Sequence, residues 1–91
     1  MAEKNLHPNT AKILLTFPIK VSGVEIDHLI MRRPKVRDRV AASKAASHEA
    51  DQTLHLVASL CEVPVEDLMD MDDVDWGKVE NQVAAFRQAR S

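Results

Sequence analysis

The sequence has few aromatic residues, one cysteine and two glycines, and each shortage argues against a class of function. The three aromatic residues are Phe17, Trp76 and Phe86, so a platform of exposed rings that stacks bases or sugars is not expected. The single Cys61 cannot form an internal disulfide, which favours a reducing, cytoplasmic environment. With only two glycines, the chain has no glycine-rich phosphate loop.

Long apolar runs and a strong net charge are also missing. No run approaches the roughly 18–20 residues that span a bilayer, and the polar opening MAEKNLHPNT does not resemble a signal peptide. The formal net charge of −2 gives no overall attraction to nucleic acid or membranes. The charges are nevertheless segregated, because residues 32–44 contain six bases and one acid, whereas residues 62–80 contain eight acids and one base.

The histidines and the acidic run lack the spacing of a metal site. His7, His28, His48 and His55 have no cysteine or acidic partner at zinc-ligand spacing. The acidic run 70–75 does not place oxygen ligands, a glycine and a final glutamate as an EF-hand loop requires, and it is interpreted as caps and first-turn acids of a helix. We therefore predict no catalytic, metal-binding or cofactor-binding residue, and no enzyme activity.

What the sequence does contain is one small α+β domain. Residues 1–11 are polar and include Pro8, so we expect a mobile N-terminal segment followed by a single domain over residues 12–91. The domain is predicted to be an N-terminal β-hairpin packed against three to four α-helices. A core of this size is small, and chains of this length often gain burial from a partner subunit.

Two apolar runs, KILLTFPI and VEIDHLIM, flank a Ser-Gly step and predict the hairpin. Ile13, Leu15 and Phe17 are expected to share one face of the first strand. In the second strand, Leu29 and Met31 are out of phase with the apolar residues before them, which predicts a bulge or bend near residue 28.

The basic stretch after the hairpin is interpreted as an elbow between a strand and a helix. Pro34 suits the first turn of that helix, and Val36 and Val40 share a narrow stripe with basic residues on both sides. Long basic side chains beside buried valines, with their charged ends in water, fit this pattern. The alternative is a small nucleic-acid-binding regulator that uses the basic segment Arg32–Lys44.

Two further helices have wide or continuous apolar stripes. One is predicted to begin at Ser47 as a cap and to continue through Cys61; its apolar arc covers about half the helix, so it is either central to the domain or packed against another chain. Cys61 lies on this arc as a small core residue. After a short helix with Pro64 at its first position, a last helix is predicted to end near Arg90. Its stripe is either core or an exposed partner-binding surface, and it consists of Trp76, Val79, Val83 and Phe86.

The order of these features over residues 12–86 resembles the tail assembly chaperones of Mu-like and related long-tailed phages. After the hairpin comes an R-x-P-x-x-x-D step at Arg32, Pro34 and Asp38. An Ala-rich helix follows, then a D-x-x-L-x-L-[VI]-A-x-L helix with Leu56 and Leu60, a P-x-E-D-L turn, an Asp-rich step and a closing helix. The sequence departs from this pattern at Arg33, where an acidic or polar residue is common, and at Cys61-Glu62-Val63, which replaces a Gly-containing turn.

The resemblance implies a non-enzymatic protein, without cofactors, that binds the tape-measure protein and keeps it soluble until the tail tube polymerises. It also implies a location in the host cytoplasm and absence from the mature virion. Binding of nucleic acid or membranes is not expected. A homo-oligomer is predicted, and a frameshifted longer form, made in many relatives, is left open. The predicted partner-binding residues are Leu54, Val57, Cys61, Trp76, Val79, Val83 and Phe86.

Overall fold

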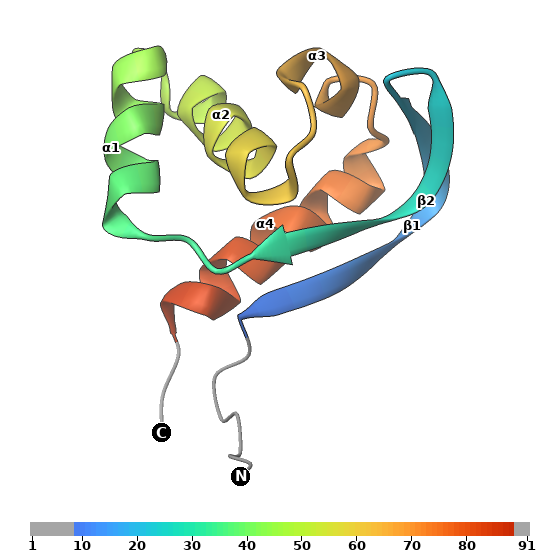
Figure 1. The fold of residues 1–91 in the computed structure, drawn as a ribbon, viewed down its shortest axis with the longest axis horizontal. Helices are drawn as coiled ribbons and strands as arrows, with labels where there is room; N and C mark the ends of the chain where they lie inside the picture. Colours follow the sequence, from blue (N-terminus) through green and yellow to red (C-terminus); the bar gives the residue numbers. More distant parts are fainter. Residues whose placement is uncertain (1–8, 89–91) are drawn as a thin grey trace, which may run out of the picture.

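The computed structural model describes residues 9–88, which form an antiparallel β-hairpin followed by four helices (Figure 1). This arrangement confirms the predicted α+β class. The predicted mobile segment 1–11 lies outside the described residues except at its end, because Thr10 and Ala11 belong to the first strand. The elements are β1 Thr10–Val21, β2 Val24–Arg32, α1 Val36–Ala45, α2 Glu49–Cys61, α3 Val65–Leu68 and α4 Asp73–Arg87.

The hairpin turns at Ser22 and Gly23, as predicted. Both residues have positive φ, 52° and 85° respectively, which is the type I′ geometry that matches the twist of the flanking strands. The turn lies at one end of the molecule, with α1 at the other (Figure 1).

The register of the hairpin shifts midway along the strands. Leu14 pairs with His28, but the pairing resumes only at Ile19 with Ile26. Residues 15–18 of β1 therefore lie opposite the single residue 27 of β2. The irregularity is at the predicted place, but the prediction of a bulge near His28 was wrong about the strand, since the surplus residues belong to β1. They allow each half of the hairpin to turn its apolar residues toward the helices.

The shift decides which hairpin residues enter the core. Ile13 and Leu15 are buried before it, and Leu29 and Met31 are buried on β2. Phe17 was expected to share their face, but it lies within the shifted segment and its side chain is 49% exposed.

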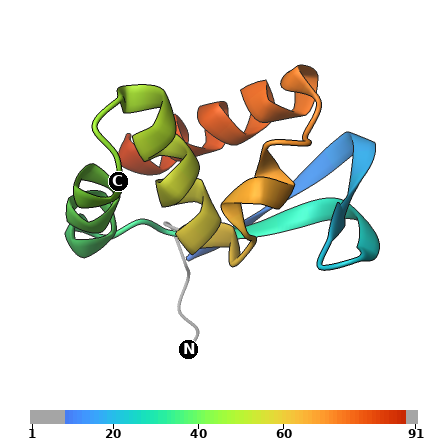
Figure 2. The ribbon, with the colours of Figure 1, turned by 90° about the horizontal axis from the view of Figure 1, so that it is seen from above.

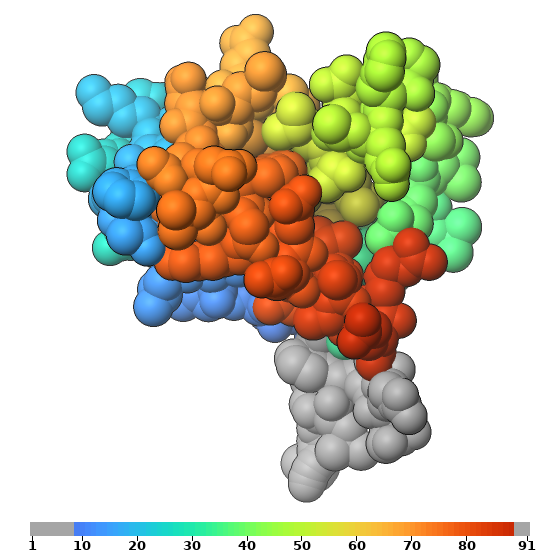
Figure 3. All heavy atoms as spheres, turned by 180° about the vertical axis from the view of Figure 1, so that it is seen from behind, coloured from blue at the N-terminus to red at the C-terminus, as the bar shows by residue number. Residues whose placement is uncertain are grey.

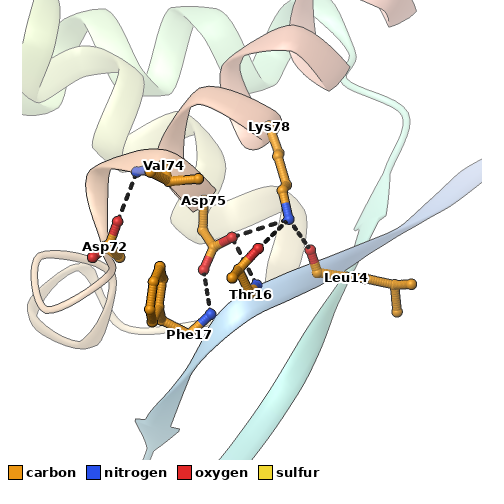
Figure 4. A network of polar contacts seen from close by, with 7 residues as sticks. All are labelled: Leu14, Thr16, Phe17, Asp72, Val74, Asp75 and Lys78. Carbon is orange, nitrogen blue, oxygen red and sulfur yellow. Dashed lines mark hydrogen bonds and ion pairs between the residues drawn. The ribbon is translucent and has the colours of Figure 1, made fainter.

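A buried carboxylate joins α4 to the shifted segment of β1 (Figure 4). Asp75 is fully buried and accepts hydrogen bonds from the backbone N–H groups of Thr16 and Phe17 at 2.8 and 2.9 Å. These donors have no partner in the β ladder, so the carboxylate meets a need that the register shift creates. Lys78 donates to the carbonyl oxygen of Leu14 and the hydroxyl of Thr16, and its Nζ lies 3.2 Å from Asp75 Oδ1.

The sequence analysis treated Asp75 only as a first-turn acid, which was incomplete. Burial of the carboxylate raises its pKa, but the backbone donors of Phe17 and Thr16 and the nearby Lys78 outweigh this, so that the pKa of Asp75 lies below its ordinary value. The capping role belongs to Asp72, whose side chain accepts from the backbone N–H of Val74 at 2.9 Å.

A second ion pair forms the elbow between β2 and α1. Arg32 donates to both carboxylate oxygens of Asp38 from its two terminal guanidinium nitrogens, Nη1 and Nη2, at 2.8 and 2.9 Å, and Asp38 also accepts from the backbone N–H of Lys35 at 2.8 Å. The hydrogen bonds of the Arg32 guanidinium lower the pKa of Asp38 to about 2. The elbow interpretation is thus confirmed, with one correction: Lys35 is the N-cap, so Pro34 precedes the helix instead of opening its first turn.

The predicted valine seam of α1 was wrong. The side chains of α1 that turn inward are Asp38 and Ala42, whereas Val36 is 80% and Val40 46% exposed. The physical reason is that Arg32 draws Asp38 toward the core, and the two valines lie on the opposite side of a 3.6-residue helix.

Helix α2 is central, which was one of the two alternatives. It contacts α1, β2 and α3, and Figure 2 shows it between α1 and α3; Leu56, Val57 and Leu60 are buried. Two predicted boundaries were wrong by one residue, since His48 is the N-cap of α2 in place of Ser47, and Pro64 is the N-cap of α3 instead of its first residue.

The C-terminal ends of α2 and α4 can also be compared with the sequence-based prediction. Glu62 ends α2 in the left-handed conformation, with φ 57°, at a position where glycine is usual. At this departure from the Gly-containing turn, a residue other than glycine therefore adopts the left-handed conformation. Helix α4 is described to Arg87, and Arg90, its predicted end, lies outside the described residues. Its stripe residues Val79, Val83 and Phe86 are buried in the core.

We predict that Asp75→Asn destabilises the protein strongly, because an amide cannot accept from both backbone N–H groups without turning its own NH₂ group toward one of them. The melting temperature should fall on the order of 10 °C. Asp73→Asn is the matched control, since Asp73 is an exposed acid in the same helical turn. Equal melting temperatures for the two variants would contradict the proposed role.

We predict that Asp38→Asn costs about 1–2 kcal/mol of unfolding free energy at pH 7. Because the folded-state pKa of Asp38 is about 2, below the ordinary value near 4, this contribution is complete above pH ~4 and disappears as the pH falls toward 2. Urea unfolding of the wild type and the variant across this range tests the prediction. A pH-independent difference would refute it, and Asp70→Asn, at an exposed acid, should show none.

Candidate functional site

The strongest candidate for a binding site is a groove between α2, α3 and α4. Its volume is about 280 Å³, and Figure 3 shows the face on which α3 and the first half of α4 lie beside α2. The only charged residues among those lining it are two acids. The lining residues are Ala50, Thr53, Leu54, Leu68, Met69, Met71, Asp73, Trp76 and Glu80.

The groove has a buried floor and a partly exposed apolar rim. Leu68 and Met71 are buried beneath it, Leu54 of α2 and Trp76 of α4 are half-buried on its two sides, and Met69 is 66% exposed. Methionine side chains adapt to irregular partners, because they are unbranched and polarizable. The arrangement suits an apolar ridge of another polypeptide.

The predicted partner-binding residues divide into two groups. Leu54 and Trp76 meet in the groove, although they come from helices separated in the sequence. The other five are core or half-buried residues outside it: Val57, Val79, Val83 and Phe86 are buried, and Cys61 is half-buried.

Sequence reasoning missed Met69 and Met71, which lie in and just after the α3 turn. Helical periodicity could not find them, since α3 has only four residues. The available signal was composition, because two methionines stand within the otherwise acidic stretch MDMDD.

The residues that carried the family resemblance have structural roles. Arg32, Pro34 and Asp38 build the elbow described above, and Leu56 and Leu60 are buried in the core.

The basic segment Arg32–Lys44 is partly used by the fold itself. Arg32 is paired with Asp38, while the guanidinium of Arg33 lies over the ring of Phe86, 4.8 Å from its centroid, and donates to the carbonyl oxygen of that residue at 3.2 Å. Binding of nucleic acid by this segment stays an untested prediction. The contacts of Arg32 and Arg33 within the chain leave two fewer arginines available to bind phosphates.

The structure also bears on metals, membranes and thiol chemistry. Within residues 9–88, no three or more His, Cys, Asp and Glu side chains cluster as potential metal ligands. None of the described helices is long and apolar enough to cross a membrane. Burial raises the pKa of the Cys61 thiol to about 11, as expected for a cysteine packed against the core.

A family model described as "phage tail assembly chaperone proteins, E, or 41 or 14" matches residues 12–88, from β1 to the end of α4. The chain belongs to this family. The tail assembly chaperone has no significant match among curated proteins or among solved structures. The match spans the hairpin, the elbow and all three helices that line the groove, so the whole fold described above is that of the chaperone domain.

We predict that Cys61 of the folded chaperone reacts slowly with thiol reagents. A pKa near 11 leaves little thiolate at pH 8, so modification should be roughly 10- to 100-fold slower than in the urea-unfolded chain. Absorbance at 412 nm after addition of Ellman's reagent measures both rates. Similar rates in the two states would contradict the buried position.

Proposed function

We propose that this chaperone binds the tape-measure protein and keeps it soluble until tail-tube subunits polymerise around it. The family match over residues 12–88 is the observation that carries the proposal. The groove supports it by offering an apolar surface for a helical client, and the proposed role, like that of the family, is non-enzymatic.

The proposed occupant of the groove is an amphipathic helix of the tape-measure protein. An apolar ridge formed by residues at i, i+3 and i+4 would lie between Leu54 and Trp76. Basic residues beside that ridge would face Asp73 and Glu80, the charged groups that line the groove among residues 9–88. Opposite charges of this kind favour orientation and rate of association more than affinity.

A single groove would bind weakly, and several copies would bind well. Each ~100 Å² of apolar surface covered contributes ~2.5 kcal/mol before the association entropy is subtracted. We therefore propose that the chaperone acts as a homo-oligomer along one client, in which linked copies gain by avidity. A frameshifted longer form would present the same groove. The proposed site of action is the host cytoplasm, and the chaperone would be absent from the finished virion.

We predict that Met69→Asp abolishes capture of the tape-measure protein. Met69 lines the groove and is 66% exposed, so the substitution places a charge against the apolar ridge of the client with little cost to folding. Co-expression of the two proteins, followed by pull-down and measurement of the soluble tape-measure fraction, tests this.

Val24→Asp is the matched control. Val24 is 64% exposed, on the hairpin and outside the groove, so this variant should capture the client as the wild type does. Loss of capture in both variants, or in neither, would count against the groove as the client site. Failure of the wild-type protein to capture the tape-measure chain would overturn the proposed function itself.

A further inference from the structure

The charges that line the groove lie on one of its two walls. Asp73 and Glu80 both belong to α4. The opposite wall, formed by α2, contributes Ala50, Thr53 and Leu54, and none of these side chains carries a charge. The groove therefore has one acidic wall and one neutral wall, so the two flanks of a client helix that lies in it meet different surroundings.

The two carboxylates form the outer rim of the acidic wall. Asp73 and Glu80 are seven residues apart, so on an α-helix they point in nearly the same direction, about 10 Å apart along the axis. On a 3.6-residue wheel, Trp76 lies between this pair and Val79, which is fully buried. The wall thus presents an indole ring toward the floor of the groove and two acids above it, two helical turns apart.

The fold uses several neighbouring acids but neither of these two. Asp67 accepts from a backbone N–H of the hairpin turn at 3.1 Å, Asp72 caps α4, and Asp75 is bound to β1. Within residues 9–88, the side chains of Asp73 and Glu80 are exposed and take part in no hydrogen bond or ion pair. Their charges are therefore free to meet the bases of a client.

We propose that Asp73 and Glu80 determine the direction in which a client helix lies in the groove. The inference rests on the proposed function and adds the charge pattern of the partner, which is an amphipathic helix with Lys or Arg along one flank of its apolar ridge, two helical turns apart. In one direction, this flank lies over the acidic wall of α4. Reversal of the helix, with its ridge still in the groove, moves the bases to the neutral wall of α2, and both ion pairs are lost.

The size of the preference follows from the exposure of the two acids. A single exposed ion pair contributes little, but two pairs that act on the same choice should favour one direction roughly 3- to 10-fold. Added salt should reduce the preference, because exposed charges are screened. The apolar contact then supplies most of the affinity, and the charges supply the orientation.

The first test uses two synthetic amphipathic helices with the same composition and the same leucine ridge, which carry two lysines on opposite flanks of that ridge. Binding is followed by the fluorescence of Trp76, the single tryptophan of the chain, and direction by NMR with a nitroxide at the N-terminus of the peptide. The nitroxide should broaden the backbone amide signals at the Asp73 end of the groove with one peptide and at the Glu80 end with the other. Broadening of the same end by both peptides, equal broadening of both ends, or no binding of either peptide would overturn the proposal.

Removal of the two charges should abolish the directional preference and keep the binding. In Asp73→Asn with Glu80→Gln, each peptide should broaden both ends of the groove, while the affinity falls by no more than about 10-fold. Asp51→Asn is the matched control, since Asp51 is an exposed acid of α2 that does not line the groove, and this variant should keep the wild-type directions. A folded double variant, as judged by circular dichroism, that also keeps them would show that these acids do not select direction.

Charge reversal tests the pairing itself. Glu80→Lys should bind the lysine peptides roughly 3- to 10-fold more weakly than the wild type does, and it should bind peptides with glutamate in place of lysine more tightly. Glu25→Lys, at an exposed acid of the hairpin outside the groove, should keep the wild-type order of affinities. If Glu80→Lys and Glu25→Lys behave alike, the proposed contact between Glu80 and the client bases is wrong.

Failure of this inference is separable from failure of the proposed function. Capture of the tape-measure protein, and its loss in Met69→Asp, do not depend on the direction of the client. If the wild type captures its client while the synthetic helices bind without a preferred direction, direction selection is refuted and the proposed function stands. If the synthetic helices bind directionally while the tape-measure protein is not captured, the selectivity of the groove is supported and the proposed client is wrong.

Discussion

The fold depends on one carboxylate that reaches between segments far apart in the chain. The register shift in β1 leaves the N–H groups of Thr16 and Phe17 without ladder partners, and Asp75, 59 residues after Thr16, accepts from both. A buried charge is tolerated only where such bonds and a nearby cation compensate for lost hydration, and Lys78 supplies the cation. The same contact fixes the first half of α4 against β1, and therefore places Trp76 on its side of the groove.

A second polar contact, between Arg32 and Asp38, determines the orientation of α1. The helix has weak amphipathic character, so the pairing of its buried Asp38 with the partly exposed Arg32 outweighs the burial of two valines. The valines consequently lie outside, beside the basic residues of the segment.

Only the edges of the two predicted helical arcs, on α2 and α4, contribute accessible apolar surface to the groove of this chaperone. Most apolar residues on these arcs of α2 and α4 are buried in the core, and Val57 and Val79 are fully buried. What stays accessible is Leu54 and Trp76 at the edges of those arcs, and Met69 on the turn between them. The proposed client helix would bind at these side chains, which the core leaves accessible.

The sequence by itself determined the elements, the hairpin turn, the core helices and the family, because these follow from local periodicity, turn chemistry and the order of motifs. Leu56, Leu60, Val79 and the Ser22-Gly23 turn could be predicted in this way. Tertiary structure alone decided the exposure of Phe17, Val36 and Val40, the inward position of Asp75, and the joining of Leu54, Trp76 and Met69 into one groove. The reason is that Phe17, Asp75 and the groove residues depend on partners distant in the chain. The exposure of the two valines depends on the pairing of Arg32 with Asp38, which helical periodicity does not reveal.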